Sequence, residues 1–522
     1  MYIRSENDYI DSILPRVKTF FDKSETEYDI LGKKVTGYRD PDAPSTWIRS
    51  VADTLRAYKY WKKDLKGVVE IFAETQSSQG WLFDYFTTSP EKVPCERENW
   101  VKFVRVPNEA DVEFRFIKAV YQVWQATGDD EWLLKMLPAM EKAINYVLTD
   151  PLRWDKKTGL VKRPYTIDTW DFDYTAGRHP WLNFQITDNT YWGIMHGDNS
   201  GYYEAFCLLS KIYEGLGNRS KSNQWSSFAR KFRSRANNIC FNGRFYTHHV
   251  PIVPVKIEGV DVSEQLSLSN PMDINRGLAT HQMAVSILKE YQNRRTRGKA
   301  FAEWFSIDPP FPAGIFGDDR IIEGAYCNGG IMPLVGGELA RAAFEHGMEG
   351  YGVDILKRYS ELTSNGQSFL WYFPDGRHAT LETSTSPDAS PYDTWGGSSM
   401  LYALVEGLAG VVDTGKLFDS VNLSPRWIAA DSEKAEVVCG YEASGKTFEY
   451  KFEHDKSSRQ IILKIQSPSK IYLHLLLPPG SRAKSLSING RSAKFENKSV
   501  YSSRYVDAIC NLRKKGELRI KY

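Results

Sequence analysis

The chain has 522 residues, more than one compact core usually holds, so we expect two domains with one of them dominant. Its 67 Lys and Arg residues nearly balance 65 Asp and Glu residues, which argues against nucleic acid or an anionic membrane surface as the main partner. No apolar run approaches the roughly 18–20 residues that cross a bilayer, and segment 1–11 lacks the apolar stretch of a signal peptide. With six widely spaced cysteines, the sequence predicts a cytoplasmic protein with reduced thiols.

Amphipathic segments with a period near 3.6 residues continue to about residue 415 and predict twelve helices of two alternating kinds. Six carry many charges, as expected of an outer ring: 6–23, 66–77, 130–148, 220–240, 296–306 and 350–364. Six are rich in Ala, Leu, Val and Gly, as expected of an inner ring: 48–62, 112–127, 200–215, 276–292, 332–346 and 397–411. The links from charged to apolar helices are long, and in an antiparallel ring they all emerge at one end, so one rim should be the active face.

After Pro425 the hydrophobic pattern changes to a period of two, interrupted by turn signals such as Asn489-Gly490. Six strands are predicted: 437–441, 447–452, 460–465, 470–477, 483–488 and 518–522. They indicate a C-terminal antiparallel β-sandwich. We therefore divide the chain into a helical ring of six hairpins (1–418), which should hold the active site, and a sandwich (419–522) without a catalytic cluster.

The densest group of acidic and aromatic residues in a long loop is Tyr165–Tyr174, with the sequence YTIDTWDFDY. Cleavage of a glycosidic bond needs an acid to protonate the leaving oxygen and a carboxylate to activate water or attack the sugar. Buried carboxylates that crowd each other raise one pKa, which suits an acid at neutral pH. The 15 Trp and 29 Tyr residues also suit stacking on sugar rings, although a large core explains most of them. A loop with helix-capping Asp residues is the simpler alternative.

Asp168-Thr169-Trp170-Asp171 is similar to the acidic–x–Trp–acidic segment before the third inner helix of glucoamylases, where the residue after Trp is the general acid. On this and two further motifs, the chain resembles the six-hairpin glycosidase superfamily, which includes glucoamylases, the debranching α-1,6-glucosidase and α-L-rhamnosidases. The resemblance implies a mainly α fold, an (α/α)6 toroid, with Asp171 as general acid. The Thr-Trp-x-Asp of debranching enzymes would instead favour Asp173.

The second motif is Ala379–Val411, which is similar to a rhamnosidase segment whose Glu is the catalytic base, and it implies this role for Glu382. The rival base is Glu323. It lies in Ile322–Gly330, which resembles a Tyr-x-Asn-Gly-Gly segment that recurs in these enzymes.

The third motif is Thr46–Leu55, which resembles the Trp-x-Arg-Asp of glucoamylase-like families, where Arg and Asp hold hydroxyls of the terminal sugar. Trp47 and Arg49 are kept, but Ser50 replaces the Asp, which puts glucose recognition in doubt and leaves Asp53 or Asp40 as substitutes. The substrate-binding candidates are Trp47, Arg49, Asp40, Asp111, Trp170, Asn199, Tyr326, Asn328, Trp371 and Trp395.

These motifs predict an inverting, exo-acting glycoside hydrolase whose substrate is an oligosaccharide or glycoside. We expect no cofactor and no catalytic metal, since the His248-His249 pair lacks a further ligand at metal spacing. A carbohydrate phosphorylase, lyase or epimerase on the same ring stays open, as does a non-catalytic carbohydrate-binding protein. The sequence leaves the sugar, the linkage and the oligomeric state open.

Overall fold

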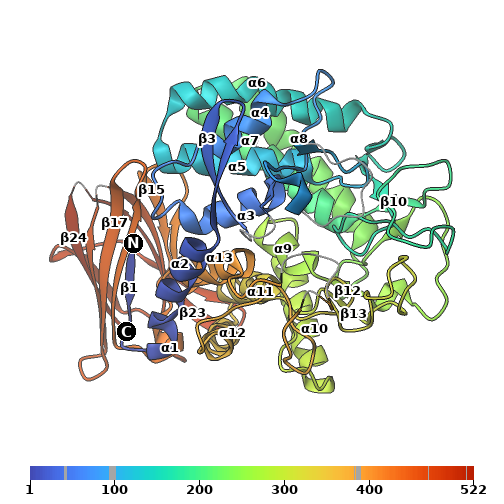
Figure 1. The fold of residues 1–522 in the computed structure, drawn as a ribbon. Coiled ribbons are helices and arrows are strands. Elements are labelled where there is room, and N and C mark those ends of the chain that lie inside the picture. The colour runs from blue at the N-terminus through green and yellow to red at the C-terminus, as the bar shows by residue number, and fades with distance from the viewer. Residues whose placement is uncertain (40–43, 93–101, 381, 384–388, 468, 513) are drawn as a thin grey trace.

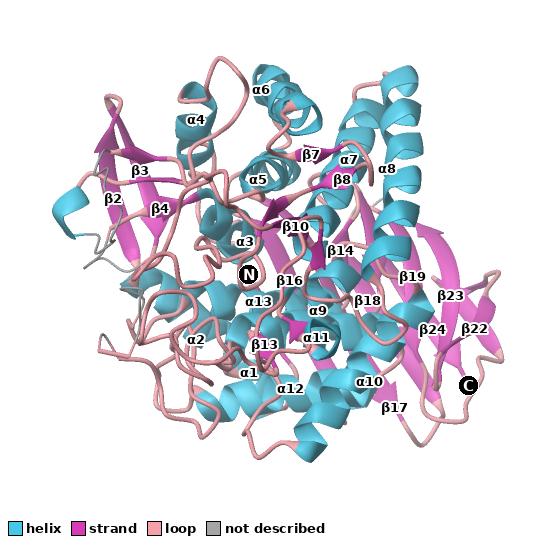
Figure 2. Cartoon of the chain, turned by 90° about the vertical axis from the view of Figure 1, so that its right-hand side faces the viewer, coloured by secondary structure: helices cyan, strands magenta, loops and turns pink. Residues whose placement is uncertain are grey.

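The structure is a computed structural model that describes residues 1–39, 44–92, 102–380, 382–383, 389–467, 469–512 and 514–522. Helices, long loops and short strands make up the chain as far as Leu408, and most of the longer strands follow (Figure 1). Figure 1 shows the C-terminal sheets at one end of the molecule and a large group of loops around β10, β12 and β13 at the opposite end. Figure 2 looks onto that loop-rich end of the molecule. No helix among the described residues combines the length and apolarity needed to cross a membrane.

Six helices, called the inner helices below, contact one another in chain order, and the last also contacts the first, so their contacts close on themselves. They are α3 (Ile48–Tyr58), α5 (Val112–Thr127), α7 (His196–Gly215), α9 (Ser269–Asn275), α11 (Pro333–Glu345) and α13 (Thr394–Tyr402). A π-helical segment, Ala403–Leu408, continues α13. Nearly every side chain of α5 and α11 is buried, because neighbours cover these helices on all sides.

Each of six outer helices packs against an inner helix and exposes a charged face. They are α2 (Ile13–Lys23), α4 (Gly67–Glu74), α6 (Asp130–Thr149), α8 (Arg219–Cys240), α10 (His281–Arg297) and α12 (Glu349–Leu362), and a short α1 (Asp8–Asp11) precedes them. Side-chain caps fix several of their starts. Asp129 accepts a hydrogen bond from the backbone N–H of Trp132 at 2.9 Å, which satisfies an otherwise unpaired donor in the first turn of α6.

The fourth hairpin differs from the sequence prediction. The segment predicted as an inner helix, 276–292, is mostly the outer helix α10, and the predicted outer helix 296–306 is not helical after Arg297. The inner position belongs to α9, which is only seven residues long and carries Pro271. Two turns are too few to produce a measurable period, so this helix left no signal in the hydrophobic pattern.

The C-terminal part contains two sheets whose strands bury alternate side chains. The seven-stranded sheet has the order β1 (Tyr2–Arg4), β16 (Lys434–Tyr441), β17 (Lys446–Asp455), β18 (Gln460–Gln466), β24 (Lys515–Lys521), β20 (Ser485–Ile488) and β21 (Arg491–Ser492). The five-stranded sheet has the order β14 (Val411–Asp413), β15 (Ser420–Leu423), β19 (Lys470–Leu476), β23 (Ser503–Asn511) and β22 (Glu496–Val500).

The six predicted strands correspond to β16–β20 and β24. The pairing is antiparallel as expected except between β15 and β19, which run parallel. Two strands of these sheets, β1 and β14, precede residue 419, because the N-terminal strand pairs with β16 and β14 follows directly on the last inner helix. The division of the chain at residue 419 remains a prediction.

Candidate active site

The long loops that precede the inner helices are joined to one another by short pairings. Three small sheets make most of these connections: β4 (Thr46–Trp47), β5 (Tyr85–Phe86) and β6 (Phe103–Val104); β9 (Arg163–Pro164), β10 (Trp192–Ile194) and β11 (Val250–Pro251); β12 (Leu266–Ser267) and β13 (Ile307–Asp308). A bridge between Ile331 and Tyr372 joins the fifth loop to the sixth. The hydroxyl of Thr394 donates to the carbonyl of Tyr38 at 2.8 Å and connects the sixth loop back to the first. The loops therefore form one connected rim.

The first loop also carries the hairpin of β2 (Glu25–Ile30) and β3 (Lys33–Tyr38), and the third carries the hairpin of β7 (Trp154–Asp155) and β8 (Leu160–Val161). These hairpins give long loops internal hydrogen bonds, which lets them hold a fixed shape.

Arg49, in the first turn of α3, binds two carboxylates from the second loop. Its Nε and Nη2 donate to the two carboxylate oxygens of Asp111, both at 2.9 Å, and Nη2 also contacts Glu109. Arg115 donates to Asp111 at 3.3 Å from the other side. The planar guanidinium matches a carboxylate at two points, so this pair fixes both side chains in orientation. The Arg49 side chain is 15% exposed, so its edge remains accessible at the rim.

Burial and the neighbouring charges give Asp111 and Glu109 different protonation states. Burial raises the pKa of Asp111, but Arg49 and Arg115 outweigh this effect and hold it far below its usual value. Burial raises the pKa of Glu109 well above its usual value, although Arg49 opposes this. The Oε1 atom of Glu109 is buried and has no hydrogen-bond partner among the described residues. The cluster therefore holds Asp111 as an anion and favours the protonated form of Glu109.

The loop segment 168–173 is anchored at its first residue by Asp168, which is fully buried. Its carboxylate accepts from the backbone N–H groups of Thr169 at 2.7 Å and Ser269 at 3.2 Å, and its own N–H donates to Nε2 of His248 at 2.8 Å. The backbone φ of Asp168 is +46°, in the left-handed region that Asp tolerates better than most residues. These bonds hold a sharp turn just before Trp170.

Asp173 anchors the other end of the segment. It is 2% exposed and its Oδ1 accepts from the side-chain amides of Asn108 at 2.9 Å and Asn183 at 2.6 Å. Burial raises the pKa of Asp173 to about 7, although the two amides oppose the shift. Its carboxyl group therefore holds the loops together and changes its protonation near neutral pH.

Asp171 lies between these anchors and is only half-buried. Burial lowers the pKa of Arg49, and the carboxylates of Asp111, Glu109 and Asp171 outweigh this effect and raise it. Burial raises the pKa of Cys327, and Asp171 adds to that rise. Asp171 therefore lies in electrostatic range of Arg49 at the start of α3 and of Cys327 in the fifth loop.

The aromatic candidates surround the same region. Trp170 is 5% exposed and meets Tyr326 edge to face, with ring centroids 5.3 Å apart. Trp47 stacks on Tyr85 at 4.3 Å and is partly exposed. Trp371 is fully buried, and its ring centroid lies 6.3 Å from that of Tyr326, so it packs behind the Trp170–Tyr326 pair.

A cavity of about 50 Å³ separates the first and sixth loops and is lined by Ser50, Tyr392 and Trp395 among others. The indole N–H of Trp395 donates to Asp53 at 2.8 Å. Asp53, the sequence-based substitute for the missing carboxylate, is 2% exposed and also accepts from Arg115 at 2.7 Å. Its carboxylate oxygens thus bond groups within the protein, and Asp53 does not line the cavity.

Several predicted residues lie elsewhere. Asn199 is buried, where its amide bonds both the N–H and the carbonyl of Val161, and Asn328 holds Phe311 in the same way. These amides support loops and are not brought into the Arg49–Asp171 region. Glu323 and Glu382 are both exposed, and Asp40 lies outside the described residues.

Sequence reasoning overlooked Glu109, although it stands two residues before the candidate Asp111. Its only sequence signal is an acidic residue shortly before a predicted helix, where acidic residues are common for structural reasons. Only the structure shows its full burial against Arg49. Among the described residues, no group of three or more His, Cys, Asp or Glu side chains is arranged to hold a metal ion.

Neither a protein-family model nor a curated protein sequence matches the chain. Solved structures do. The α-L-rhamnosidase from Dictyoglumus thermophilum matches with a TM-score of 0.59 at 11% identity, over 100% of this chain and 50% of that one. The GH78 family rhamnosidase of Bacillus sp. GL1 matches with a TM-score of 0.58 at 14% identity. This match covers 91% of this chain and 42% of the rhamnosidase. The chain thus spans about half the length of these two enzymes or less.

A shorter protein matches a different share of the chain. The GH63 mannosylglycerate hydrolase from Thermus thermophilus, solved with glucose, has a TM-score of 0.52 at 12% identity and covers 75% of this chain and 99% of its own. At these identities the likeness concerns the fold. The chain shares its fold with these two α-L-rhamnosidases and with the mannosylglycerate hydrolase, in agreement with the resemblance to glycosidases stated from the sequence.

Proposed function

We propose that the chain is an inverting, exo-acting glycoside hydrolase built on an (α/α)6 toroid (1–418) with a C-terminal β-sandwich (419–522). One observation carries the proposal: Asp171 lies within electrostatic range of Arg49 and directly follows Trp170, which packs on Tyr326. The fold shared with α-L-rhamnosidases and a mannosylglycerate hydrolase supports a glycoside as substrate. A group of carboxylates, a guanidinium and aromatic rings at one end of a helical ring suits a sugar with many hydroxyls.

Asp171 is the proposed general acid. It needs a proton at the start of the reaction, which it gives to the leaving oxygen. Asp111, which is held as an anion, binds Arg49 and offsets its positive charge. Trp170 and Tyr326 supply an apolar wall next to the proposed acid. Arg49 and Trp47 bind the terminal sugar in this proposal, through hydroxyl hydrogen bonds and ring stacking respectively.

Glu382 is the proposed general base. It lies in the loop before α13, while Asp171 lies in the loop before α7, and in a ring of six inner helices these two stand opposite each other. Inversion needs about 6.5–9.5 Å between the two carboxyl groups to admit a water, against about 5–5.5 Å for retention. The exposure of Glu382 suits a residue that takes up water. Asp173 and Glu323 form the alternative pair.

The function is tested with nitrophenyl glycosides and oligosaccharides, including α-L-rhamnosides and mannosylglycerate, while NMR follows the anomer of the first product. Asp171→Asn should slow cleavage by about 10²–10⁴, the usual size of acid–base catalysis. A substrate with an activated leaving group should restore part of the rate, since it needs no proton. Azide should restore turnover in Glu382→Ala, because it replaces the group that handles water.

Asp188→Asn is the matched control, an exposed carboxylate in the same loop as Asp171. Normal rates in Asp171→Asn together with an inactive Asp173→Asn would move the acid role to Asp173. A product of retained configuration would contradict inversion. Failure of the wild-type chain to cleave any glycoside would refute the hydrolase.

A further inference from the structure

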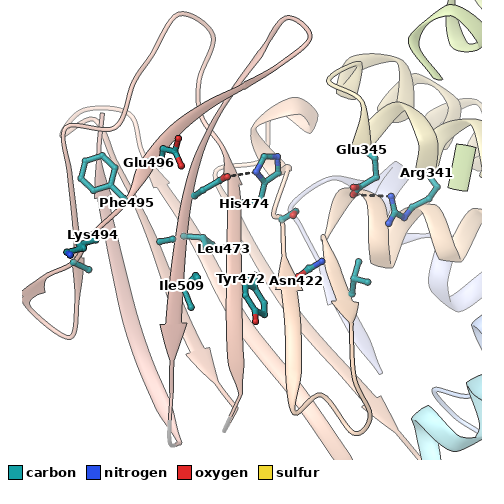
Figure 3. A pocket seen from close by; sticks show the side chains of 15 residues that line it. Arg341, Glu345, Asn422, Tyr472, Leu473, His474, Lys494, Phe495, Glu496 and Ile509 are labelled. Carbon is teal, nitrogen blue, oxygen red and sulfur yellow. Dashed lines mark hydrogen bonds and ion pairs between the residues drawn. The ribbon is translucent and has the colours of Figure 1, made fainter. Parts of the chain in front are cut away.

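A hollow of about 770 Å³ lies on the outer face of the five-stranded sheet. Its lining comes from β14, β15, β19 and β23, from the loop before β22 and from the last turns of α11. Figure 3 shows the labelled side chains spread from Arg341 and Glu345, across the strands, to Lys494 and Phe495. The sheet lies at the opposite end of the molecule from the rim loops (Figure 1), so this hollow is separate from the candidate active site.

Strand register places a row of complementary side chains across this face. Asn422 on β15 pairs with Tyr472 on β19, which pairs with Ile509 on β23. Cross-strand partners project to the same face, so the amide, the phenol ring and the aliphatic side chain are neighbours. Ile509 is 63% exposed, which is unusual for a large apolar side chain. Asn422 makes no side-chain hydrogen bond to any described residue, so both ends of its amide are available to a ligand.

Two residues further along β19, and so on the same face, His474 is held in a fixed orientation. Its ring stacks on Tyr505 with centroids 3.9 Å apart and planes 9° apart, and Nδ1 bonds Asp507 on the neighbouring strand at 2.6 Å. Its Nε2 has no partner within the described part of the chain. This imidazole therefore presents one fixed polar atom, Nε2, beside Tyr472. Because the ring is already held in place, it loses little conformational entropy when a ligand binds.

The three carboxylates that line the hollow are each paired with a cation, whereas Lys494, a single lining ammonium, forms no ion pair with a described residue. Glu345 contacts Arg341 at 3.0 Å, Asp507 contacts His474, and Glu496 accepts from Lys498 at 2.6 Å. A phosphate or an anionic polymer would meet these carboxylates without a matching cluster of cations. The chemistry of the surface therefore matches a ligand that is neutral and rich in hydroxyl groups.

We propose that this hollow is a non-catalytic binding site for a neutral glycan chain. The Tyr472 ring supplies the flat surface on which the C–H face of a sugar packs, and Asn422 and His474 supply donors and acceptors for its hydroxyls. The ammonium of Lys470 lies 4.8 Å from the Tyr472 ring centroid, but this exposed, flexible side chain yields its place to a sugar. Four neighbouring strands span about 14 Å, which favours a short chain of sugars over a single ring.

The test uses the full chain on an array of neutral and acidic oligosaccharides, followed by titration calorimetry with the strongest neutral binder. Calorimetry is carried out in the Asp171→Asn background to limit consumption of the probe. Tyr472→Ala and Asn422→Ala should each weaken binding at least ten-fold. The matched control is Tyr2→Ala, an exposed tyrosine on β1 of the other sheet, which should bind as the parent does. Thermal unfolding of each variant checks that the sandwich is intact.

Absence of any glycan binding by the wild type overturns the proposal, as does binding that both hollow variants retain in full. Binding restricted to acidic oligosaccharides also contradicts it, because the paired charges predict a neutral ligand. Hydrolysis of nitrophenyl glycosides is measured in parallel. Hydrolysis of glycosides without glycan binding would refute the proposed second site alone. Glycan binding through Tyr472 without hydrolysis would refute the proposed hydrolase activity alone.

Discussion

Three aspartates of one short segment have three different environments. Asp168 and Asp173 are buried at its two ends, where they accept hydrogen bonds from other loops, while Asp171 between them is half-buried at the rim. A buried carboxylate with several donors fixes the backbone around it, because leaving those donors unpaired costs about 1–3 kcal/mol each. The two anchors therefore pre-organise the proposed acid, which needs a fixed position relative to the leaving oxygen.

The raised pKa of Asp173 predicts a specific dependence of stability on pH. Its pKa is about 7 in the folded chain and about 3.9 when unfolded, so between these values the folded state binds the extra proton. The contribution of Asp173 to stability is thus present at low pH and is lost as the pH rises from about 4 to 7, by at most about 4 kcal/mol. Asp173→Asn cannot ionise and should gain stability relative to the wild type over this range.

Urea unfolding of Asp173→Asn and wild type at several pH values between 5 and 8 measures this difference. Asp188→Asn, an exposed neighbour in the same loop, should run parallel to the wild type. If Asp173→Asn also runs parallel, the carboxyl group ionises in the folded chain as it does in water, and its assignment as a buried anchor is wrong.

The sequence identified this segment but could not assign its members. Asp168, Asp171 and Asp173 look equivalent in the chain, and burial, which separates them, depends on Asn108, His248 and Ser269 from other loops. Because burial cannot be read from the sequence, Glu109 was overlooked. For the same reason Asn199 and Asn328 were proposed as sugar ligands, although their side-chain amides hydrogen-bond backbone groups.

At the scale of the element, small residues let the inner helices approach closely. A Cβ on Gly337 of α11 would lie 2.3 Å from the carbonyl carbon of Ser399 in α13. Composition rich in Gly and Ala was also the signal that separated inner from outer helices in the sequence. That signal failed at the fourth hairpin, because α9 is short, polar and buried, whereas α10 carries enough apolar residues to resemble an inner helix.

Two glycines therefore respond differently to the same substitution. Gly337→Ala should lower the free energy of unfolding by about 1–3 kcal/mol or more, since α11 and α13 must separate to admit the methyl group. Gly350→Ala, near the start of α12, meets no atom within 4 Å and should be neutral or stabilising by up to about 1 kcal/mol, because alanine favours the helix. Denaturant unfolding of both variants checks this, and equal effects would contradict the tight helix crossing.

At the scale of the whole molecule, the helices and the sheets are connected through more than the chain itself. The N-terminal strand β1 pairs with β16, so the first residues belong to a sheet formed by the last hundred. Hydrophobic alternation predicted most strands of the long antiparallel meander. It could not predict a three-residue strand such as β1 or the parallel pair β15–β19, because their pairing depends on residues far away in the sequence.

Arg426 lies where the helical part meets the sandwich. It is 1% exposed and donates to the carbonyl of Gly407 at 2.6 Å, to Glu345 of α11 at 2.9 Å and to the hydroxyl of Tyr505 on β23 at 3.2 Å. Tyr505 in turn donates to Glu349 of α12. One guanidinium thus links two helical segments to the sheet, so helices and strands should unfold together.

We expect the wild type to unfold in one calorimetric transition and Arg426→Ala to lose about 2–4 kcal/mol, because the substitution leaves buried acceptors without a donor. Its melting temperature should fall by several degrees, or the transition should split into a helical and a sheet component. Arg482→Ala, an exposed arginine of the sandwich, is the matched control and should stay within about 0.5 kcal/mol of the wild type. Two transitions in the wild type would mean that the sandwich folds independently of the ring and that Arg426 only fills the joint between them.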